Sequence, residues 1–316
     1  MFHFINKKYQ KANKIILCTD KGIREMIALF FYMKARIESM KKQLPLLLLL
    51  PGSILLIVFL ILPLVKIFVP TIYEGGFTTE NYREFFEDAY FMKIMIRTIK
   101  IAVLCTGLSM FFGVPTAYFI SRCNKSKRGI LLALTIFPLL TNSVIRSFAW
   151  INILGRNGII NSLLMNSKVI EKPLTLLYTE FAIIVGSVYL FLPLMIITVV
   201  GTMENIEDDL MEAAESLGAN RLRAFVKIVL PMSIPGIIVG SVLVFTGTLT
   251  AYTTPQLLGG NRNLVLATFI YQKAMTLGDW TGAGVIAAVM IVTTIIVIQI
   301  FNAIAAKIDK RGEKYA

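Results

Sequence analysis

The loop over residues 202–233 holds an unusual set of charged side chains, because long apolar runs flank it on both sides. Its acids are Glu204, Glu207, Asp208, Asp209, Glu212 and Glu215. A carboxylate such as that of Glu212 can pair with a cation on a partner, whereas negative charge disfavours docking on an anionic membrane face. The chemistry that this loop predicts is therefore contact with a protein.

The same loop has the spacing of a helix, since apolar residues recur at steps of three and four and make one apolar stripe. The stripe consists of Met203, Ile206, Leu210, Ala213, Ala214 and Leu217. Gly218 supplies the left-handed position that commonly ends a helix. A second short helix is expected over ANRLRAFVKIVL, before Pro231. The pattern predicts a compact helix–turn–helix in which the small Ala213–Ala214 pair admits a close partner. A solvated amphipathic loop without a partner is the alternative that the pattern leaves open.

Residues for catalysis or metal binding are scarce in this chain. The one histidine is His3, and the three cysteines, Cys18, Cys105 and Cys123, lack the spacing of a metal or disulfide motif. No catalytic residue and no metal site are predicted. The chain also lacks the G-x-x-x-x-G-K-[ST] loop, so we expect any ATP and magnesium to be handled by another chain.

Composition places the chain in a membrane. It has 316 residues, of which 56% are hydrophobic and 16% charged, whereas soluble domains carry about 25% charge. We predict an all-α, polytopic fold, because six apolar runs are long enough to cross a hydrocarbon core of about 30 Å. The runs lie at about 44–70, 98–120, 129–153, 181–201, 234–254 and 283–306. Prolines 63, 115, 138 and 193 predict kinks inside these spans.

The distribution of Lys and Arg predicts the orientation. With both termini in the cytoplasm, the inner segments hold 21 cations and the outer segments 7, as the positive-inside rule requires. The net charge of +13 is thus explained by a lipid membrane, and no nucleic-acid partner is expected. The expected localisation is the plasma membrane of a prokaryote.

Three regions follow from this topology. Residues 1–43 are expected to form a basic cytoplasmic arm, either with an interfacial helix over 23–43 or as a regulatory or partner-binding segment. Residues 44–310 form the six-helix membrane domain, with the loop at 202–233. A short cytoplasmic tail occupies 311–316.

A family resemblance rests on one long motif: EAA, three residues, Gly, nine residues, then I-x-L-P. It occurs without deviation at Glu212, Ala213, Ala214, Gly218, Ile228, Leu230 and Pro231. This pattern resembles the EAA signature of permease subunits in type I ABC importers. The resemblance implies the fold of those permeases and a coupling helix that docks on a separate ATPase subunit. It also implies two ATPase copies, a second permease of similar fold and an extracytoplasmic substrate-binding protein, with no cofactor and no enzymatic role in this chain.

Three further stretches, 141–161, 201–219 and 249–270, are similar to the B-type permease of spermidine/putrescine importers. This implies that the chain forms half of a translocation path for polyamines. Related permeases for ferric iron, opines or amino-acid-like solutes share much of the pattern, so another small solute is the alternative. The long N-terminus departs from that permease, which usually starts closer to its first span.

Candidate pore or gate residues lie in or near the predicted spans. Arg146 either bonds to backbone carbonyls or to Asn142, joining helices, or it lines a cavity, as intramembrane charges usually do. The aromatic residues either pack in the core or line an amine path by cation–π contact. They are Trp150, Tyr118, Tyr189 and Tyr252. The acidic outer loop over 73–90 either contacts the binding protein or concentrates amines near the entrance.

Two rival classes are disfavoured. An ion-coupled secondary transporter would use carboxylates within its spans, yet no Asp or Glu occurs from Ile94 to Ile170 or from Ser216 to Gly278. An intramembrane enzyme would need a nucleophile with a base, or metal ligands, and His3 is the lone histidine.

Overall fold

The computed structural model describes residues 49–73, 76–207 and 209–313, with side chains as far as Lys307. Residues 1–43, residues 44–48 of the first predicted span and the last three residues of the tail lie outside this part. The chain divides into two units, Met1–Lys66 and Ile67–Ala316, which are described separately. Within the described residues the fold is all-helical, apart from an isolated bridge between Tyr73 and Phe77.

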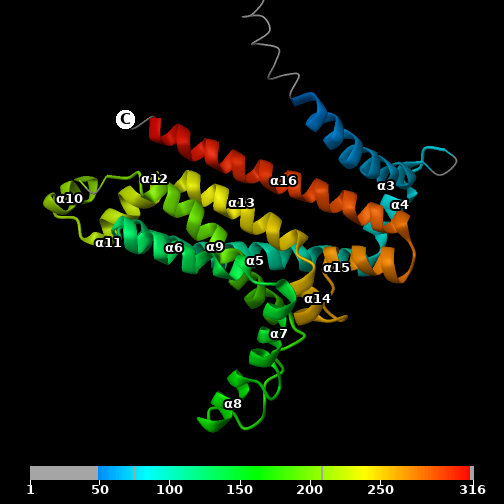
Figure 1. Ribbon diagram of the computed structural model, residues 1–316, viewed down its shortest axis with the longest axis horizontal. Helices are drawn as coiled ribbons and strands as arrows, with labels where there is room; N and C mark the ends of the chain where they lie inside the picture. Colours follow the sequence, from blue (N-terminus) through cyan, green and yellow to red (C-terminus); the bar gives the residue numbers. More distant parts are fainter. Residues whose placement is uncertain (1–48, 74–75, 208, 314–316) are drawn as a thin grey trace, which may run out of the picture. The chain divides into compact units, whose positions relative to one another are not determined.

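The helical elements follow one another closely (Figure 1), and η marks π-helical turns. In chain order they are η2 (Ile57–Ile61), α3 (Leu62–Ile72), α4 (Glu80–Glu87), α5 (Ala89–Ser121), α6 (Lys125–Leu140), α7 (Ser143–Leu154), α8 (Ile159–Asn166), α9 (Glu180–Met203), α10 (Asp209–Ser216), α11 (Arg221–Ala224), η3 (Phe225–Val229), α12 (Leu230–Met232), α13 (Ile234–Thr250), α14 (Thr253–Gly259), α15 (Leu266–Tyr271), η4 (Gln272–Thr276) and α16 (Trp280–Glu313).

Among the described residues, four helices are long and apolar enough to cross a membrane. They are Leu49–Ile72, Ala89–Ser121, Glu180–Met203 and Trp280–Lys307. Two bent pairs, Lys125–Leu140 with Ser143–Asn166 and Arg221–Met232 with Ile234–Thr250, raise the number to six if each pair is one span. The predicted all-α, polytopic fold is confirmed.

Two predicted spans are interrupted in the structure. The third, expected as one helix over 129–153, bends by 92° between Leu140 and Ser143. Thr141 there has an extended backbone, with a ψ of 145°, and Asn142 caps the next helix. The fifth, expected to reach 254, ends at Thr250 because Ala251 is extended, with a ψ of 126°. Both breaks coincide with short, largely polar stretches, 141–143 and 250–254, which the apolar residues around them concealed.

Helices α5, α9 and α13 pack against one another and form the centre of the second unit (Figure 1). The contact between α9 and α13 depends on small residues. A Cβ added to Gly240 of α13 would lie 2.5 Å from the Oγ1 of Thr198 and 2.7 Å from the Sδ of Met195. The two backbones can therefore approach closely only without a side chain at Gly240.

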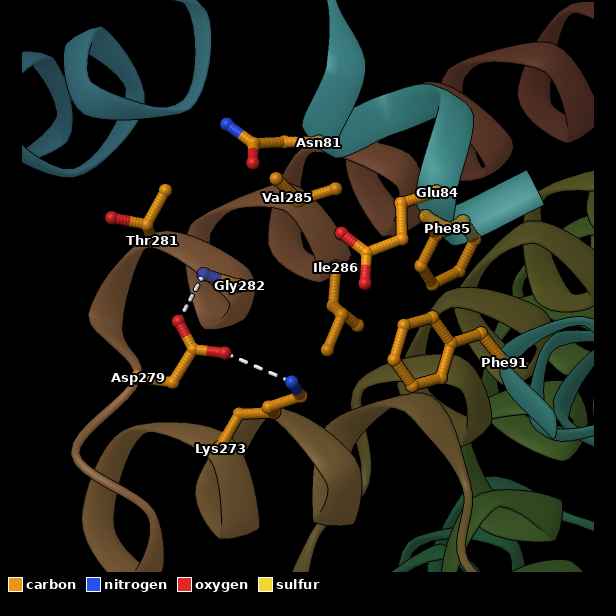
Figure 2. Close-up of a pocket in the computed structure, with 10 residues that line it drawn as sticks. All are labelled: Asn81, Glu84, Phe85, Phe91, Lys273, Asp279, Thr281, Gly282, Val285 and Ile286. Carbon is orange, nitrogen blue, oxygen red and sulfur yellow. Dashed lines mark hydrogen bonds and ion pairs between the residues drawn. The ribbon is translucent and has the colours of Figure 1, made fainter. Parts of the chain in front are cut away.

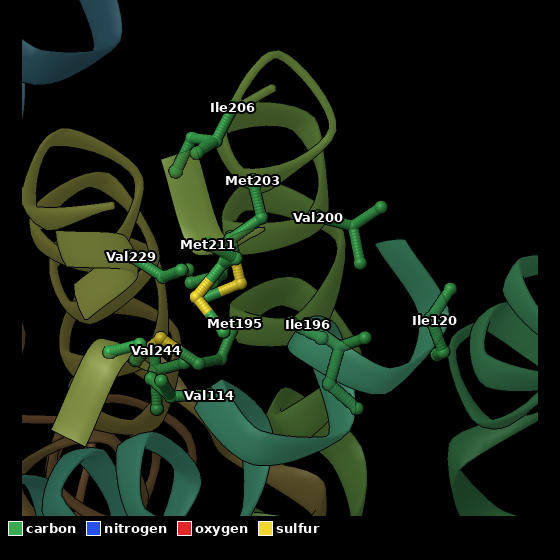
Figure 3. Packing of buried hydrophobic residues seen from close by; sticks show 13 residues of the cluster. Val114, Ile120, Met195, Ile196, Val200, Met203, Ile206, Met211, Val229 and Val244 are labelled. Atoms are coloured by element: carbon green, nitrogen blue, oxygen red, sulfur yellow. The ribbon is translucent and has the colours of Figure 1, made fainter. Parts of the chain in front are cut away.

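The largest apolar cluster of the second unit extends from these helices into the loop between α9 and α13 (Figure 3). Met195, Val199 and Met203 of α9 are fully buried. The loop contributes Ile206, Met211, Ala224 and Val229 to the same cluster. The loop and the spans therefore share one close-packed core.

The start of α16 is fixed by Asp279. Its Oδ1 accepts a hydrogen bond from the Gly282 backbone N–H at 2.7 Å, and its Oδ2 lies 2.9 Å from the Lys273 Nζ (Figure 2). These contacts tie η4 to the first turn of α16, at the opposite end of the unit from α10 (Figure 1).

Candidate functional site

The turn after α10 has the hydrogen bonds of a Schellman motif. The Ala219 N–H donates to the Ala214 carbonyl at 3.0 Å, and the Gly218 N–H donates to the Glu215 carbonyl at 2.9 Å. Gly218 has a φ of 86°, a conformation in which a β-carbon is unfavourable. The predicted left-handed end at Gly218 is confirmed.

The second helix of the loop begins at a capped residue and ends near proline. The Asn220 Oδ1 accepts from the Arg223 N–H at 2.8 Å, as N-cap side chains do. The helix passes through the π-helical turn η3, in which the Leu230 N–H donates to the Phe225 carbonyl. Pro231, which has no N–H to donate, follows directly. The expected helix–turn–helix is present.

One detail of the predicted stripe is wrong. Met203 belongs to the end of α9 and Ile206 to the turn after it, so neither shares a helix with Leu210. Both residues are buried in the core, which explains why they are apolar although they lie outside α10.

The motif residues divide by exposure. Glu212, Ala213, Gly218 and Pro231 are exposed, whereas Ala214, Ile228 and Leu230 are half-buried. No ion pair joins the Glu212 carboxylate to another described residue. Glu212, Ala213 and Gly218 are therefore presented to solvent, whereas Ala214, Ile228 and Leu230 are partly covered.

A groove lies between the two helices of the loop. Its volume is about 300 Å³. Its lining combines apolar and basic residues: Ala214, Leu217, Gly218, Ala219, Arg223, Ala224, Lys227 and Ile228. Leu217 is 89% exposed. An apolar surface with two cations and no acid is suited to a protein partner that presents an apolar side chain beside a carboxylate.

Three contacts attach this loop to neighbouring helices. The rings of Tyr118 and Phe225 lie 4.8 Å apart between centroids. The Arg122 Nη1 donates to the Ile206 carbonyl at 3.1 Å, and the Arg128 Nη1 lies 3.2 Å from the Glu204 Oε2. The C-terminal end of α5 and the first turn of α6 are thereby joined to the loop.

Arg146 lies at the break between α6 and α7. It is 8% exposed, and its Nη1 donates to the Pro138 carbonyl at 2.7 Å and to the Thr141 carbonyl at 3.3 Å. The Asn142 side chain does not bond to the guanidinium, because its Oδ1 accepts from the N–H groups of Val144 and Ile145. The Asn142 carbonyl accepts instead from the backbone N–H of Arg146 at 3.1 Å. The Pro138 and Thr141 carbonyls both lie at the C-terminal end of α6, and Arg146 belongs to α7. This geometry agrees with the role in which Arg146 joins helices.

The four aromatic candidates lie in three separate places. Trp150 of α7 meets Tyr189 of α9 edge to face, with centroids 5.6 Å apart. Tyr252 packs on Tyr271 at 4.9 Å. Tyr118 instead packs against Phe225 of the loop between α9 and α13, away from the other three rings.

Sequence reasoning missed an ion cluster at the start of α9. Glu180 pairs with the Arg97 Nε at 3.1 Å and with the Lys100 Nζ at 2.8 Å. Arg97 also donates to the carbonyls of Arg262 and Leu264. The partners of Arg97 lie more than 80 residues away along the chain, so the sequence does not show the pairing. The basic residues near the start of the second span were the one signal that could have indicated it.

Comparison of the sequence with models of protein families identifies the class of this protein. Residues 109–311 match the binding-protein-dependent transport system inner membrane component. The chain belongs to this family, the permease components of ABC importers, and is therefore a multi-pass inner membrane protein. Such a component is not the catalytic subunit of its transporter and carries no cofactor, which confirms both expectations.

Two of the similar proteins are permeases of spermidine/putrescine transport systems. The chain is 32% identical over 204 residues to the spermidine/putrescine transport system permease protein PotB of Escherichia coli (strain K12), covering 65% of this chain and 74% of PotB. PotB of Haemophilus influenzae is 33% identical over 208 residues, with 66% and 72% covered.

A solved structure agrees with the fold. The crystal structure of a bacterial ABC transporter that imports the acidic polysaccharide alginate contains a chain with a TM-score of 0.69 and 21% identity. The match covers 86% of this chain and 99% of that one.

Proposed function

We propose that this permease forms half of the translocation path for polyamines such as spermidine and putrescine. The observation that carries the proposal is the 32% identity to PotB over 204 residues. Arg146 argues against a tight cationic site within this chain's spans, because a buried guanidinium repels a second cation. Selectivity is therefore assigned mainly to the extracytoplasmic substrate-binding protein.

The loop between α9 and α13 is the proposed docking element for a separate ATPase, present in two copies. Two features support this role: the exposed Glu212 carboxylate and the groove with Arg223 and Lys227. A second permease of similar fold completes the path. Both termini are placed in the cytoplasm on the basis of the 21-to-7 distribution of cations.

The test is ATP-dependent uptake of radiolabelled spermidine and putrescine into proteoliposomes. These contain the permease with its partner permease and ATPase, and the assay is run with and without the binding protein. We expect uptake that requires ATP and the binding protein. Transport of an anion or a sugar, with spermidine and putrescine ignored, would contradict the polyamine assignment and leave the family assignment standing.

The coupling role has a separate measurement. Glu212→Lys should leave the permease in the membrane and weaken its retention of the ATPase in a pull-down. Glu207→Lys makes the same charge change outside the motif and serves as the matched control. Equal ATPase retention by wild type and Glu212→Lys would refute the docking role.

A further inference from the structure

A second pocket lies at the end of the unit opposite the loop, between α4, η4 and the first turns of α16 (Figure 2). Its volume is about 280 Å³, near the lower end of the range of about 300–1,000 Å³ for small-molecule sites. None of its lining residues belongs to the motif or to the candidate pore. In the proposed orientation it opens on the outer face of the membrane.

The hydrogen-bond donors of this pocket are mostly occupied. The Lys273 Nζ bonds to the Asp279 Oδ2 at 2.9 Å, and the Gly282 N–H bonds to the Asp279 Oδ1 at 2.7 Å. The Asn81 Nδ2 donates to the Thr71 carbonyl at 3.3 Å. These contacts leave the pocket few donors for an incoming ligand.

Acceptors remain available. The Glu84 carboxylate makes no ion pair with another described residue, and it is directed into the pocket (Figure 2). The Asn81 Oδ1 is the free end of its amide, and the Thr281 hydroxyl can accept or donate. Lys273 and Asp279 neutralise each other, so Glu84 sets the net charge of the lining at minus one.

The remaining wall is apolar. Phe85 and Phe91 stack with centroids 5.7 Å apart, and Val285 and Ile286 line the side formed by α16. A ligand that fits must therefore donate hydrogen bonds, carry positive charge and bury a short hydrocarbon stem.

We propose that this pocket binds a small alkylammonium, with its –NH₃⁺ group on the Glu84 carboxylate and the Asn81 Oδ1. Its methylene chain lies along Phe91, Val285 and Ile286. A charge-assisted hydrogen bond to the carboxylate anchors the head, and apolar contact with the wall favours an amine over free ammonium. The assignment does not depend on what the transporter carries.

The test uses radiolabelled butylammonium and the full permease with its partner subunits in lipid nanodiscs, without ATP or binding protein. We expect saturable binding that unlabelled butylammonium displaces and butanol does not. Glu84→Gln should weaken binding about tenfold, equivalent to about 1.4 kcal/mol. Glu87→Gln removes the same charge from α4, but Glu87 pairs with Arg83 outside the pocket, and it should leave binding within about twofold.

A second measurement does not depend on the folding of the Glu84 variant. In a chain without its native cysteines, Thr281→Cys places a thiol on the pocket lining. Butylammonium, but not butanol, should slow the reaction of that thiol with a neutral maleimide. Glu84→Asp, which keeps the charge, should retain most of the protection.

Two results would overturn the assignment. The first is equal butylammonium affinity in wild type and Glu84→Gln. The second is absence of butylammonium binding and of thiol protection, together with loss of binding-protein affinity in Glu84→Gln. In that case the pocket receives a side chain of a protein instead of a free amine.

Discussion

The rings of Tyr118 and Phe225 lie 4.8 Å apart between centroids and connect the C-terminal end of α5 with the loop that carries the EAA motif. Aromatic pairs of this kind contribute about 0.5–1.5 kcal/mol beyond their buried area. Because Phe225 follows α11 directly, the pair couples movement of the loop to a helix at the centre of the unit.

Phe225→Ala should therefore lower transport more than ATPase activity. The measurement is the number of solutes taken up per ATP hydrolysed in proteoliposomes. Phe119→Ala is the matched control, since Phe119 lies beside Tyr118 in sequence but is 66% exposed. An unchanged ratio in Phe225→Ala would show that this aromatic contact does not carry the coupling.

Gly218→Val should disturb the docking loop. At a φ of 86° a β-carbon costs about 1 kcal/mol or more, so the Schellman turn opens and the groove changes shape. We expect weaker ATPase retention and reduced uptake. Gly201→Ala is the control, because no atom lies within 4 Å of its added Cβ. Normal retention in Gly218→Val would contradict the requirement for this turn.

Cysteine labelling should place residue 125 inside and residue 80 outside. The reason is the excess of Lys and Arg in the segments assigned to the cytoplasm. A membrane-impermeant maleimide added to intact cells should label Glu80→Cys, while Lys125→Cys should react only after permeabilisation. Labelling with the reverse pattern would exclude the proposed orientation.

Arg146→Met should destabilise the permease. It removes the hydrogen bonds to the Pro138 and Thr141 carbonyls, and a buried acceptor left unpaired costs about 1–3 kcal/mol. The expected result is a lower Tm of the detergent-solubilised chain, with partial recovery in Arg146→Lys. A pore role predicts something else: altered solute selectivity at unchanged Tm.

Asp279 should keep the proposed alkylammonium site independent of pH in the neutral range and sensitive only to acid. The hydrogen bond from Lys273, and further the Gly282 N–H, hold the pKa of its carboxyl below the ordinary range. The carboxylate is thus charged above its ordinary pKa of about 3.9, and the ion pair is lost only as the pH falls through the depressed value. Butylammonium binding should stay constant between pH 6 and 8, as far as Asp279 controls it.

Asp279→Asn gives this position at neutral pH the uncharged state that the Asp279 carboxyl has in acid. It leaves the Lys273 ammonium uncompensated beside the site, so butylammonium affinity should fall and salt should restore part of it by screening. Titrations of the wild type and Asp279→Asn in nanodiscs at two ionic strengths check this. Equal affinities would mean that Lys273 does not face the ligand.

Local features of this chain were predictable from its sequence. Gly218 predicts the end of a helix, because the ability of glycine to adopt a positive φ is a property of the residue itself. Pro231 likewise limits the second helix of the loop, and apolar runs of sufficient length define the spans. Family membership followed from one motif at fixed spacing.

Features that depend on distant contacts were not predictable. The break at Thr141 did have a local signal, the polar run Thr141, Asn142 and Ser143, but the apolar residues on both sides outweigh it over the length of a span. Trp150 and Tyr189 meet only because α7 and α9 cross. The pocket with Glu84 combines residues more than 180 positions apart. The periodicity of a sequence does not predict which distant residues come into contact.

The interrupted third span has a consequence for how the nascent protein enters the bilayer. Helix α6 has 16 residues, about 24 Å at 1.5 Å per residue, which is shorter than the hydrocarbon core. The translocon must also accept Arg146, at about 2.5–3.5 kcal/mol for a central arginine. The carbonyls that satisfy Arg146 come together only once the chain has bent at Thr141. The bend at Thr141 therefore lowers the cost of integrating this segment, because only the bent chain gives the Arg146 guanidinium its backbone acceptors.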